Sequence, residues 1–398
     1  MFGLFEKKSP YAATFGKGRV VMISGCKDEQ TSGDALKIDK YFGLPDDVGA
    51  GGAGGACTNA LMQILHRQNS ETPGYDGTWG ELILDLRKGL ATAANEEGKK
   101  VFTQIPQLSS SFNLPLGEKF SIKSPESKRT KALLIGINYG DRPSGKLRGS
   151  HNDVKTMRQF ITKMGFEDKP TTLKVLMDDG DKATDDPTKK NILSALKWLV
   201  KDAAPGDSLF MHFSGHGSEV DDINGDEASG KDQTMVPMDF DGKNGHIIDD
   251  VIYSEVVGKL PEGCELFCLF DCCHSGTIMD LPYVIAVTPA VEKEIEKAMG
   301  SGQAMPGMQD SEVHANKIVD GKRGKEEEMQ PQLAERQEAP ASGMSLHLIV
   351  IIIAVVVAIA FGTLGMGSSQ STLPTEGTSR PKEEQSRFAF FGNRNKKL

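Results

Sequence analysis

The sequence predicts an α/β fold built on a mostly parallel sheet with helices on both faces. Two apolar runs, 209–213 and 266–270, have the length of buried parallel strands, and each is followed by a short polar segment. Between residues 129 and 270, further apolar runs alternate with segments of helical periodicity, which is the pattern of β–α–β units. We therefore expect one sheet whose carboxyl edge carries the polar segments.

The expected elements follow one another from residue 19 onward. A capping box formed by Thr78 and Glu81 marks the start of one helix. The glycine-rich stretch 48–55 lacks the Gly-Lys-Ser/Thr of a phosphate-binding loop, so we interpret it as a close backbone approach or a mobile loop. Strands are expected at 19–25, 101–112, 133–137, 173–177, 209–213 and 266–270, and helices within 56–68, 81–95, 154–164 and 191–200.

The polar segments after the two apolar runs carry His216 and Cys273. Ligands bind at the carboxyl ends of strands in open α/β sheets, so these two side chains can meet across one crevice. A thiolate is the reactive form of cysteine, and an adjacent imidazole that takes its proton makes nucleophilic attack feasible. The glycines beside both residues allow backbone N–H groups to approach a substrate carbonyl, and we expect the amides of Gly217 and Cys273 to form an oxyanion hole.

Three alternatives compete with this interpretation. A buried cysteine and a core histidine are common, but both residues lie beyond the strands in Gly- and Ser-rich segments, where core residues are unusual. Cys272 is adjacent to Cys273, and residue type alone does not decide which one attacks. His212 competes with His216 as the base, but strand alternation keeps His212 inside the strand, so His216 is preferred.

At these motifs the chain resembles a known family. HFSGHG at 212–217 and DCCHSG at 271–276 are similar to the catalytic half of metacaspases, in the caspase-like superfamily. KALLIGINYG, LRGSHND, KDQTMVPMDF, IIDD and SGTIMDLP extend the resemblance over residues 129–285. It implies a caspase-like (caspase-hemoglobinase) three-layer α/β/α sandwich, and it selects Cys273 as the nucleophile.

The first part of the chain resembles the small subunit of the same family. SGCKDEQTSGD, GACTNALM and PQLSSS carry this likeness, and here they precede the large-subunit-like part. That order resembles the circularly permuted type III metacaspases. We therefore expect residues 1–128 (small-subunit-like) and 129–300 (large-subunit-like) to build one sheet, since moving a terminal block of a compact domain can preserve its contacts.

The resemblance also implies an acidic pocket that takes Arg or Lys before the scissile bond. Residue by residue, it assigns Asp153, Ser214 and Asp271 to this pocket, and Ser150 stands where many relatives have Cys. A guanidinium in a partly desolvated pocket is well matched by a carboxylate. The alternatives are that Asp153 is an N-terminal helix charge and that Asp271 orients a loop.

Calcium is the cofactor that the resemblance implies. The positions that match the family's ion site are Asp232, Asp249, Asp250 and Asp280. Hard cations take several carboxylate oxygens, so this set is chemically suitable. On the residues alone, solvated loop charges are the more common use of such acids.

The C-terminal region differs in character. Residues 301–344 are polar and lack apolar periodicity, which predicts a disordered linker. The composition of residues 345–367 predicts a transmembrane helix, because 348–367 are apolar and contain no charged residue. A polar tail, 368–398, follows. Without a signal peptide we expect the protease domain in the cytosol, although the basic tail would favour the opposite orientation. Linker sites for self-cleavage are Lys317, Lys322, Arg323 and Lys325.

Composition narrows the possible functions. The net charge of -9 argues against nucleic acid as a partner, and the spacing of the six cysteines suggests neither disulfides nor a zinc site. We therefore expect a calcium-dependent cysteine endopeptidase that cuts polypeptides after Arg or Lys through a thioester, with a monomeric protease domain anchored to a membrane. The alternatives are a catalytically silent, membrane-anchored scaffold with the same fold and a caspase that cuts after Asp.

Overall fold

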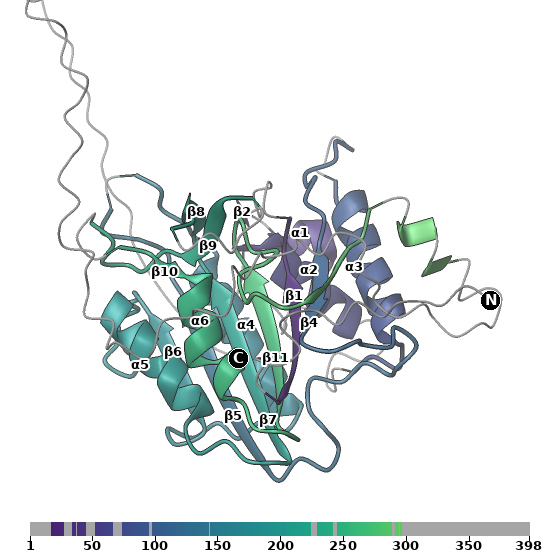
Figure 1. The fold of residues 1–398 in the computed structure, drawn as a ribbon. Coiled ribbons are helices and arrows are strands. Elements are labelled where there is room, and N and C mark those ends of the chain that lie inside the picture. Colours follow the sequence, from purple (N-terminus) through teal and green to yellow (C-terminus); the bar gives the residue numbers. More distant parts are fainter. Residues whose placement is uncertain are drawn as a thin grey trace, which may run out of the picture. The chain divides into compact units, whose positions relative to one another are not determined.

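The central sheet contains strands from both parts of the chain. The computed structural model describes residues 17–296 apart from 28–33, 37, 45–51, 67–73, 95–97, 143, 224–228, 242–244, 289–290 and 294. Of the two units into which the chain divides, Met1–Glu327 and Glu328–Leu398, only the first contains described residues. The seven strands of its main sheet lie in the order β12-β4-β1-β11-β7-β5-β6 (Figure 1). They are β1 (Arg19–Ser24), β4 (Gln107–Ser110), β5 (Arg129–Gly136), β6 (Leu173–Met177), β7 (Asp207–Ser214), β11 (Glu265–Asp271) and β12 (Tyr283–Ala286).

The sheet is mostly parallel, as the sequence predicts. β1, β11, β7, β5 and β6 pair in parallel along the sheet, and β4 lies antiparallel between β1 and β12. β1 from the first part of the chain pairs in parallel with β11, with Arg19–Ser24 opposite Glu265–Phe270. Both parts therefore contribute to one sheet.

Helices cover both faces of this sheet. α2 (Ala56–Leu65), α3 (Trp79–Thr92) and α4 (Ser150–Lys163) pack on one face, and α5 (Lys189–Val200) and α6 (Asp249–Glu255) pack on the other (Figure 1). The remaining short elements are α1 (Ile38–Phe42), η2 (Val257–Lys259), β2 (Asp34–Leu36), β3 (Ala53–Gly55), β8 (Gly217–Asp221), β9 (Lys231–Met235) and β10 (Ile247–Ile248).

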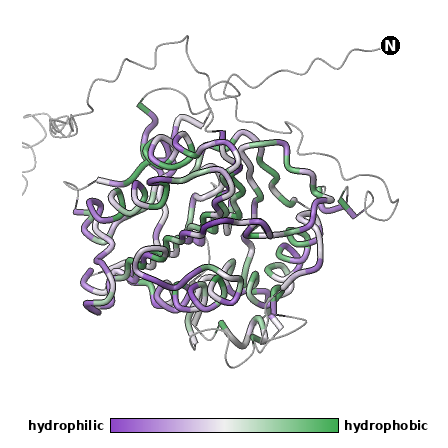
Figure 2. Tube along the Cα trace, turned by 90° about the horizontal axis from the view of Figure 1, so that it is seen from below, coloured by the Kyte–Doolittle hydropathy of each residue, from purple (hydrophilic) through white to green (hydrophobic). Residues whose placement is uncertain are grey.

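Strand alternation divides the core into two clusters. In β7, Phe210 joins the cluster under α2–α4, and its neighbour Met211 joins the cluster under α5 and α6. Every residue of β7 is buried, which explains why its residues 209–213 are mostly apolar and do not alternate with exposed polar residues. Figure 2 shows the hydrophobic stretches inside and the hydrophilic stretches around them.

Most of the expected elements are confirmed. Thr78 and Glu81 form the complete capping box of α3, with Thr78 N–H bonded to Glu81 Oε2 at 2.7 Å. The expected strand 101–112 is reduced to β4, because Pro106, which lacks an N–H donor, directly precedes it. The three-stranded sheet β10-β9-β8 was not expected, since all three strands are short and β8 and β9 are mostly polar.

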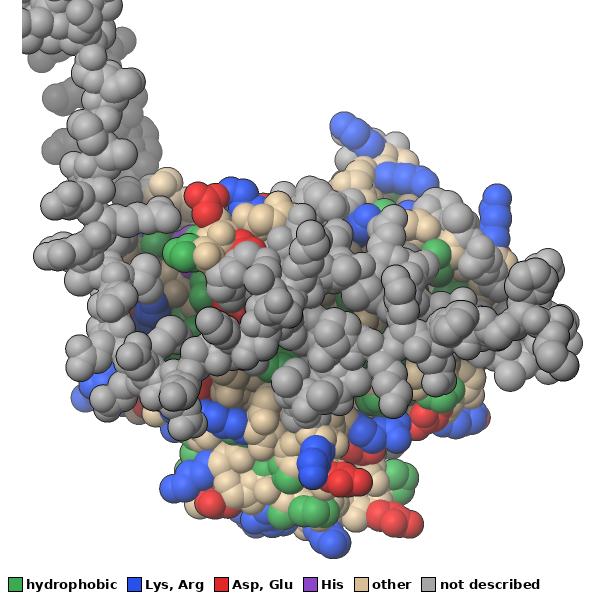
Figure 3. Space-filling view, viewed as in Figure 1, with side chains coloured by type: hydrophobic (Ala, Val, Ile, Leu, Met, Phe, Trp, Pro, Cys, Tyr) green, Lys and Arg blue, Asp and Glu red, His purple; other side chains and the backbone are tan. Residues whose placement is uncertain are grey.

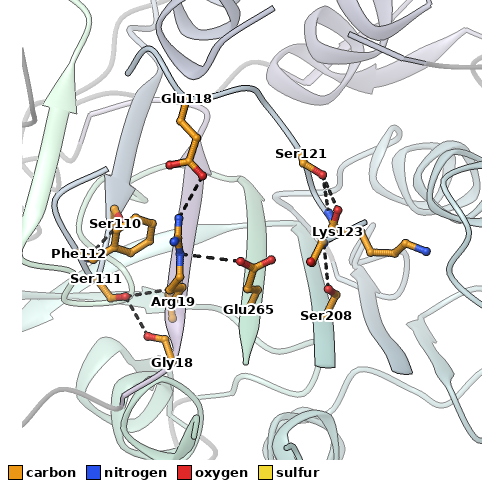
Figure 4. Close-up of polar contacts among 12 residues, drawn as sticks. Gly18, Arg19, Ser110, Ser111, Phe112, Glu118, Ser121, Lys123, Ser208 and Glu265 are labelled. Atoms are coloured by element: carbon orange, nitrogen blue, oxygen red, sulfur yellow. Dashed lines mark hydrogen bonds and ion pairs between the residues drawn. The ribbon is translucent and has the colours of Figure 1, made fainter. Parts of the chain in front are cut away.

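The segment between β4 and β5 crosses the amino ends of the central strands. Ser111 Oγ accepts the Val20 N–H at 2.9 Å, and the Ser124 N–H donates to Ser208 Oγ at 3.2 Å (Figure 4). Arg19 reaches Glu118 at 3.3 Å in the same network. The connection between the two parts thus lies at the sheet edge opposite the carboxyl ends of these strands.

The described surface carries charges of both signs. On the face shown in Figure 3, Lys and Arg side chains are interspersed with Asp and Glu. Interspersed charges keep a surface solvated without giving this face a field of a single sign.

Candidate active site

The carboxyl ends of β7 and β11 bring the two predicted catalytic segments together. Ser214 lies opposite Asp271 at the ends of these parallel strands, and His216 and Cys273 each follow two residues later. A Cβ atom on Gly217 would overlap with the carbonyl oxygen of Cys273. The two segments are therefore in backbone contact, and only glycine fits at position 217.

His216 is held by its surroundings on several sides. Its Nε2 lies 2.6 Å from the carbonyl oxygen of Gly145, and its backbone N–H donates to Tyr139 Oη at 2.9 Å. A carbonyl oxygen only accepts hydrogen bonds, so Nε2 carries the ring proton. This tautomer leaves Nδ1 of His216 able to accept a proton.

The two adjacent cysteines differ in exposure. Cys272 is 1% exposed and belongs to the core cluster under α5 and α6, whereas Cys273 is partly exposed. Burial raises the pKa of the Cys272 thiol well above its ordinary value, so this thiol stays protonated. Cys273 is thus the cysteine of this pair that a substrate can reach.

A third thiol lies directly behind this pair. Cys26 Sγ donates to the carbonyl oxygen of Cys272 at 3.3 Å. Burial, followed by the charge of Cys273, raises the pKa of Cys26 to about 12. Cys26 is therefore a protonated packing thiol at neutral pH.

His212 lies inside β7, as strand alternation predicts. It is fully buried, and burial lowers its pKa to about 3. Its Nε2 lies 3.4 Å from Thr58 Oγ1. A neutral imidazole sealed from solvent is poorly placed to shuttle protons to a substrate, which favours His216 as the base.

The four predicted pocket residues are all buried. Asp153, Ser214, Asp271 and Ser150 are 1%, 3%, 5% and 2% exposed. Ser214 Oγ donates to Asp153 Oδ2 at 2.8 Å, which joins the end of β7 to the first turn of α4. Ser150 begins α4, and its backbone N–H donates to Asn138 Oδ1 at 3.1 Å.

The first part of the chain closes onto both acids. The Gly55 N–H lies 3.1 and 2.9 Å from the two carboxylate oxygens of Asp153, and the Thr58 N–H donates to Asp271 Oδ2 at 2.8 Å. A Cβ atom on Gly55 would overlap with Asp271 Oδ2 and lie 3.0 Å from Asp153 Oδ2. Both carboxylates therefore meet at the amino end of α2, whose dipole favours negative charge.

Sequence reasoning did not assign Gly55, Thr58 or Asn59 to the site. Asn59 Nδ2 donates to Asp153 Oδ1 at 3.1 Å. The signal was the glycine-rich stretch before α2, and its interpretation as a close backbone approach is confirmed at Gly54 and Gly55. Which acids it approaches could not be read from the sequence, because they lie some hundred or more residues further along the chain.

The acidic residues assigned to calcium lie on neighbouring elements. Asp232 belongs to β9, Asp249 and Asp250 begin α6, and Asp280 follows the Cys273 segment with a positive φ of 49°. The Gln233 N–H donates to Asp249 Oδ2 at 2.7 Å. In the part of the chain that the structure describes, no three acidic, His or Cys side chains are arranged to hold a metal ion, so calcium binding stays a prediction.

The C-terminal predictions lie outside the described residues. These are the linker 301–344, the span 345–367 and the tail 368–398, together with Lys317, Lys322, Arg323 and Lys325. Among the helices within residues 17–296, none combines the length and the hydropathy needed to cross a membrane.

Comparison with known proteins points to one family. Residues 130–282 match the family model described as Metacaspase, peptidase C14 domain. The chain is 44% identical over 283 residues to Metacaspase III c of Phaeodactylum tricornutum, which covers 70% of this chain and 78% of that relative. It is 46% identical over 195 residues to Metacaspase-1 of Botryotinia fuckeliana (49% of this chain, 45% of the relative). It is also 45% identical over 192 residues to Metacaspase-1 of Debaryomyces hansenii (48% and 43%), so it spans less than half of these last two relatives.

Proposed function

The chain belongs to the metacaspases, which are cysteine peptidases of the C14 family, and within them to type III; we propose that it is an endopeptidase that cuts after Arg or Lys. Polypeptides are the substrates that this family implies. The register of β7 and β11 carries the proposal, because it sets His216 and Cys273 two residues beyond the Ser214–Asp271 pair. Nucleophile, base and acidic pocket would then share one sheet edge.

In the proposed mechanism, the Cys273 thiol transfers its proton to Nδ1 of His216. The thiolate attacks the carbonyl carbon of the substrate residue, and the resulting oxyanion accepts hydrogen bonds from the N–H groups of Gly217 and Cys273. The imidazolium then protonates the leaving amine, the C–N bond breaks, and a thioester remains on Cys273. Water, deprotonated by His216, hydrolyses the thioester and restores the thiol.

Support for a basic residue before the scissile bond comes from the way in which the two pocket acids are bound. Asp153 accepts hydrogen bonds from Gly55 N–H, Asn59 Nδ2 and Ser214 Oγ, which are all neutral donors. Neutral donors of this kind stabilise a carboxylate without cancelling its charge, which suits a pocket for a guanidinium or an ammonium. We assign Asp153 and Asp271 to charge recognition, and Ser214 and Ser150 to the pocket wall.

We also propose that calcium activates the enzyme through Asp232, Asp249, Asp250 and Asp280. Their carboxylates are the hard oxygen donors that this ion prefers. Asp232 and Asp249 are 4% and 1% exposed, and Thr277 Oγ1 donates to Gln233 Oε1 at 2.5 Å, linking the segment before Asp280 to β9. Bound calcium would supply charge that orders this segment next to Cys273.

The C-terminal part of the proposal is the membrane anchor at 345–367, with the protease domain in the cytosol. Self-cleavage in the linker at Lys317, Lys322, Arg323 or Lys325 would release the enzyme. Membranes that carry the full chain test this idea: calcium should release a soluble fragment ending in the linker. If the chain stays intact and membrane-bound, release by self-cleavage is wrong.

The proposed activity is tested by peptide hydrolysis with the full chain. Matched peptides ending in Arg, Lys or Asp are supplied with calcium or with chelator, beside the Cys273→Ala variant. We expect calcium-dependent cleavage after Arg and Lys that the variant abolishes. Cleavage after Asp alone would contradict the pocket assignment. No cleavage of any peptide by a folded chain would favour the scaffold alternative.

A further inference from the structure

Two residues of the connection between β5 and α4, Tyr139 and Gly145, contact the imidazole of His216. Beyond the contact between Gly145 and Nε2, the rings of Tyr139 and His216 lie 4.6 Å apart with an angle of 31° between their planes. The Tyr139 hydroxyl accepts the backbone N–H of His216. One loop therefore contacts the base on its ring face, at one ring nitrogen and at its backbone.

Tyr139 occupies its place in this loop at a conformational cost. Its φ is +55°, in the left-handed region that bulky residues rarely adopt because their side chains crowd the backbone there. It is 2% exposed, and its hydroxyl donates to the carbonyl oxygen of Val236 at 2.7 Å. Burial raises the pKa of Tyr139, so the hydroxyl stays protonated and keeps this bond. The Val236 N–H in turn donates to the carbonyl oxygen of His216 at 3.1 Å, which closes a ring of contacts around the base.

Asp178, which directly follows β6, holds the backbone on both sides of Tyr139. Its Oδ1 accepts the Asn138 N–H at 2.8 Å, and its Oδ2 accepts the Gly140 N–H at 3.3 Å. His151 Nε2, from the first turn of α4, lies 2.5 Å from Asp178 Oδ1. Burial alone would raise the pKa of Asp178, but the hydrogen bonds from His151 and from the Asn138 N–H outweigh it and lower the pKa. The carboxylate is therefore ionised and accepts three donors at neutral pH.

We propose that Asp178 and Tyr139 are positioning residues for the base of the peptidase reaction. Asp178 fixes the two N–H groups that flank Tyr139 and so keeps Tyr139 in its left-handed conformation. Tyr139 and Gly145 then fix the plane and the tautomer of His216, with Nδ1 left to accept the proton of Cys273. The inference rests on the proposed function, because it requires His216 to be the base.

The first test is Asp178→Asn in the full chain, with Asp185→Asn as the control. Asp185 carries an exposed carboxylate beside β6, 3.9 Å from Lys174. An amide at 178 would turn one of its three acceptor contacts into a clash between donors. We expect kcat to fall about tenfold to a hundredfold because the imidazole is misplaced, with KM within about twofold and with the control unchanged.

The second measurement is the rate at which iodoacetamide alkylates Cys273 at pH 7. Alkylation consumes the thiolate, so the rate should fall by about the same factor as kcat if His216 no longer takes the proton efficiently. All rates are expressed per titrated active site, so a variant that only unfolds more easily changes the active fraction and not the rate. Unchanged alkylation in a folded Asp178→Asn variant would overturn the proposal.

Tyr139→Phe decides the question if Asp178→Asn fails to fold. It removes only the hydroxyl and should lower kcat and the alkylation rate by about three- to tenfold, whereas wild-type values for both would overturn the proposal. Cys273→Ala and His216→Ala distinguish a failure of the proposed function from a failure of the positioning role. If either keeps activity, the proposed function fails; if both are inactive while Asp178→Asn and Tyr139→Phe match the wild type, only the positioning role fails.

Discussion

Buried carboxylates at the two ends of the central sheet have different hydrogen-bond donors. At the amino end, Arg129 binds Asp207 through Nε at 3.0 Å and Nη2 at 2.5 Å, so opposite charges neutralise each other. At the carboxyl end, Asp153 and Asp271 accept hydrogen bonds from backbone N–H groups of the first part of the chain. In an ion pair the two opposite charges compensate each other. Hydrogen bonds from neutral N–H groups leave the negative charge of a carboxylate in place, so it still attracts a cation. The first arrangement suits stability and the second suits binding.

Backbone strain follows the same division. Of the four described non-glycine residues with positive φ, Tyr139, His274 and Asp280 lie in segments that follow carboxyl ends of the strands, and Asp202 lies near the amino end. Such conformations persist where the surrounding contacts over-determine them, and they are concentrated at functional sites. Changes at the carboxyl end should therefore alter activity, and changes at the amino end should alter stability.

The largest expected effect is that of Gly217→Ala. The added methyl would overlap with the Cys273 carbonyl oxygen and push the proposed oxyanion donors apart. We expect kcat/KM to fall about a hundredfold or more. Gly74→Ala is the control, because a Cβ there meets nothing within 4 Å. Near wild-type hydrolysis by Gly217→Ala would show that the Gly217 and Cys273 amides do not form the oxyanion hole.

Asp271→Asn tests whether the charge of the proposed pocket is used in substrate binding. It keeps the size of the side chain but removes the charge, so kcat/KM for an Arg peptide should fall about a hundredfold. A peptide with neutral citrulline in place of Arg should lose much less. The control is Asp168→Asn, whose carboxylate pairs with Arg158 at the surface. Equal losses for both peptides would show that Asp271 does not read charge.

His212 makes a prediction for stability against pH. Its pKa is about 3 in the fold and 6.5 ordinarily, so the unfolded chain binds the extra proton as the pH falls below 6.5. At pH 5 this amounts to about 2 kcal/mol of lost stability. Urea unfolding at pH 7.5 and pH 5 should therefore show a smaller loss for His212→Gln than for the wild type. An identical loss in both chains would mean that His212 does not titrate in this way.

The smallest effect on activity is expected at the amino end. Arg129→Met removes the partner of Asp207 and should lower Tm, with kcat/KM per active site unchanged. Burial raises the pKa of Asp207, but Arg129 lowers it overall, so the pair stabilises the fold above the ordinary value of 3.8. The difference in Tm between variant and wild type should shrink as the pH falls through this lowered pKa. A loss of activity equal to that of Asp271→Asn would show that the ion pair at the amino end also serves catalysis.

Local patterns in the sequence were sufficient to predict most of the fold. Apolar runs located β1, β5, β6, β7 and β11, because a strand buried on both faces needs a continuous apolar segment. The capping box located α3 for the same local reason. β8 and β9 escaped prediction because their residues are mostly polar, even though β9 is largely buried, and β10 escaped because it is only two residues long, so none of the three has a sustained apolar signal.

The sequence predicted the motifs that carry the candidate catalytic residues, but not the residues that support them. His216 and Cys273 stand out because both follow apolar strands in Gly-rich segments. Gly55 and Asp178 do not, because their roles depend on partners that the fold brings close, as Gly55 meets Asp153 and Asp271. The glycine-rich stretch indicated a close backbone approach at Gly55, but a single sequence carries no signal for which distant residues are approached.

Covalent labelling of the full chain shows directly which thiol attacks a substrate carbonyl and which residue the pocket accepts. Two peptidyl chloromethyl ketones that differ only in ending with Arg or Asp are incubated with the chain in calcium, and the labelled residue is identified by mass spectrometry. We predict that the Arg reagent modifies Cys273, that the Asp reagent does not, and that His216→Ala slows the labelling. Modification of Cys272 or Cys26 instead would show that Cys273 is not the nucleophile, and equal labelling by both reagents would show that the pocket does not select Arg.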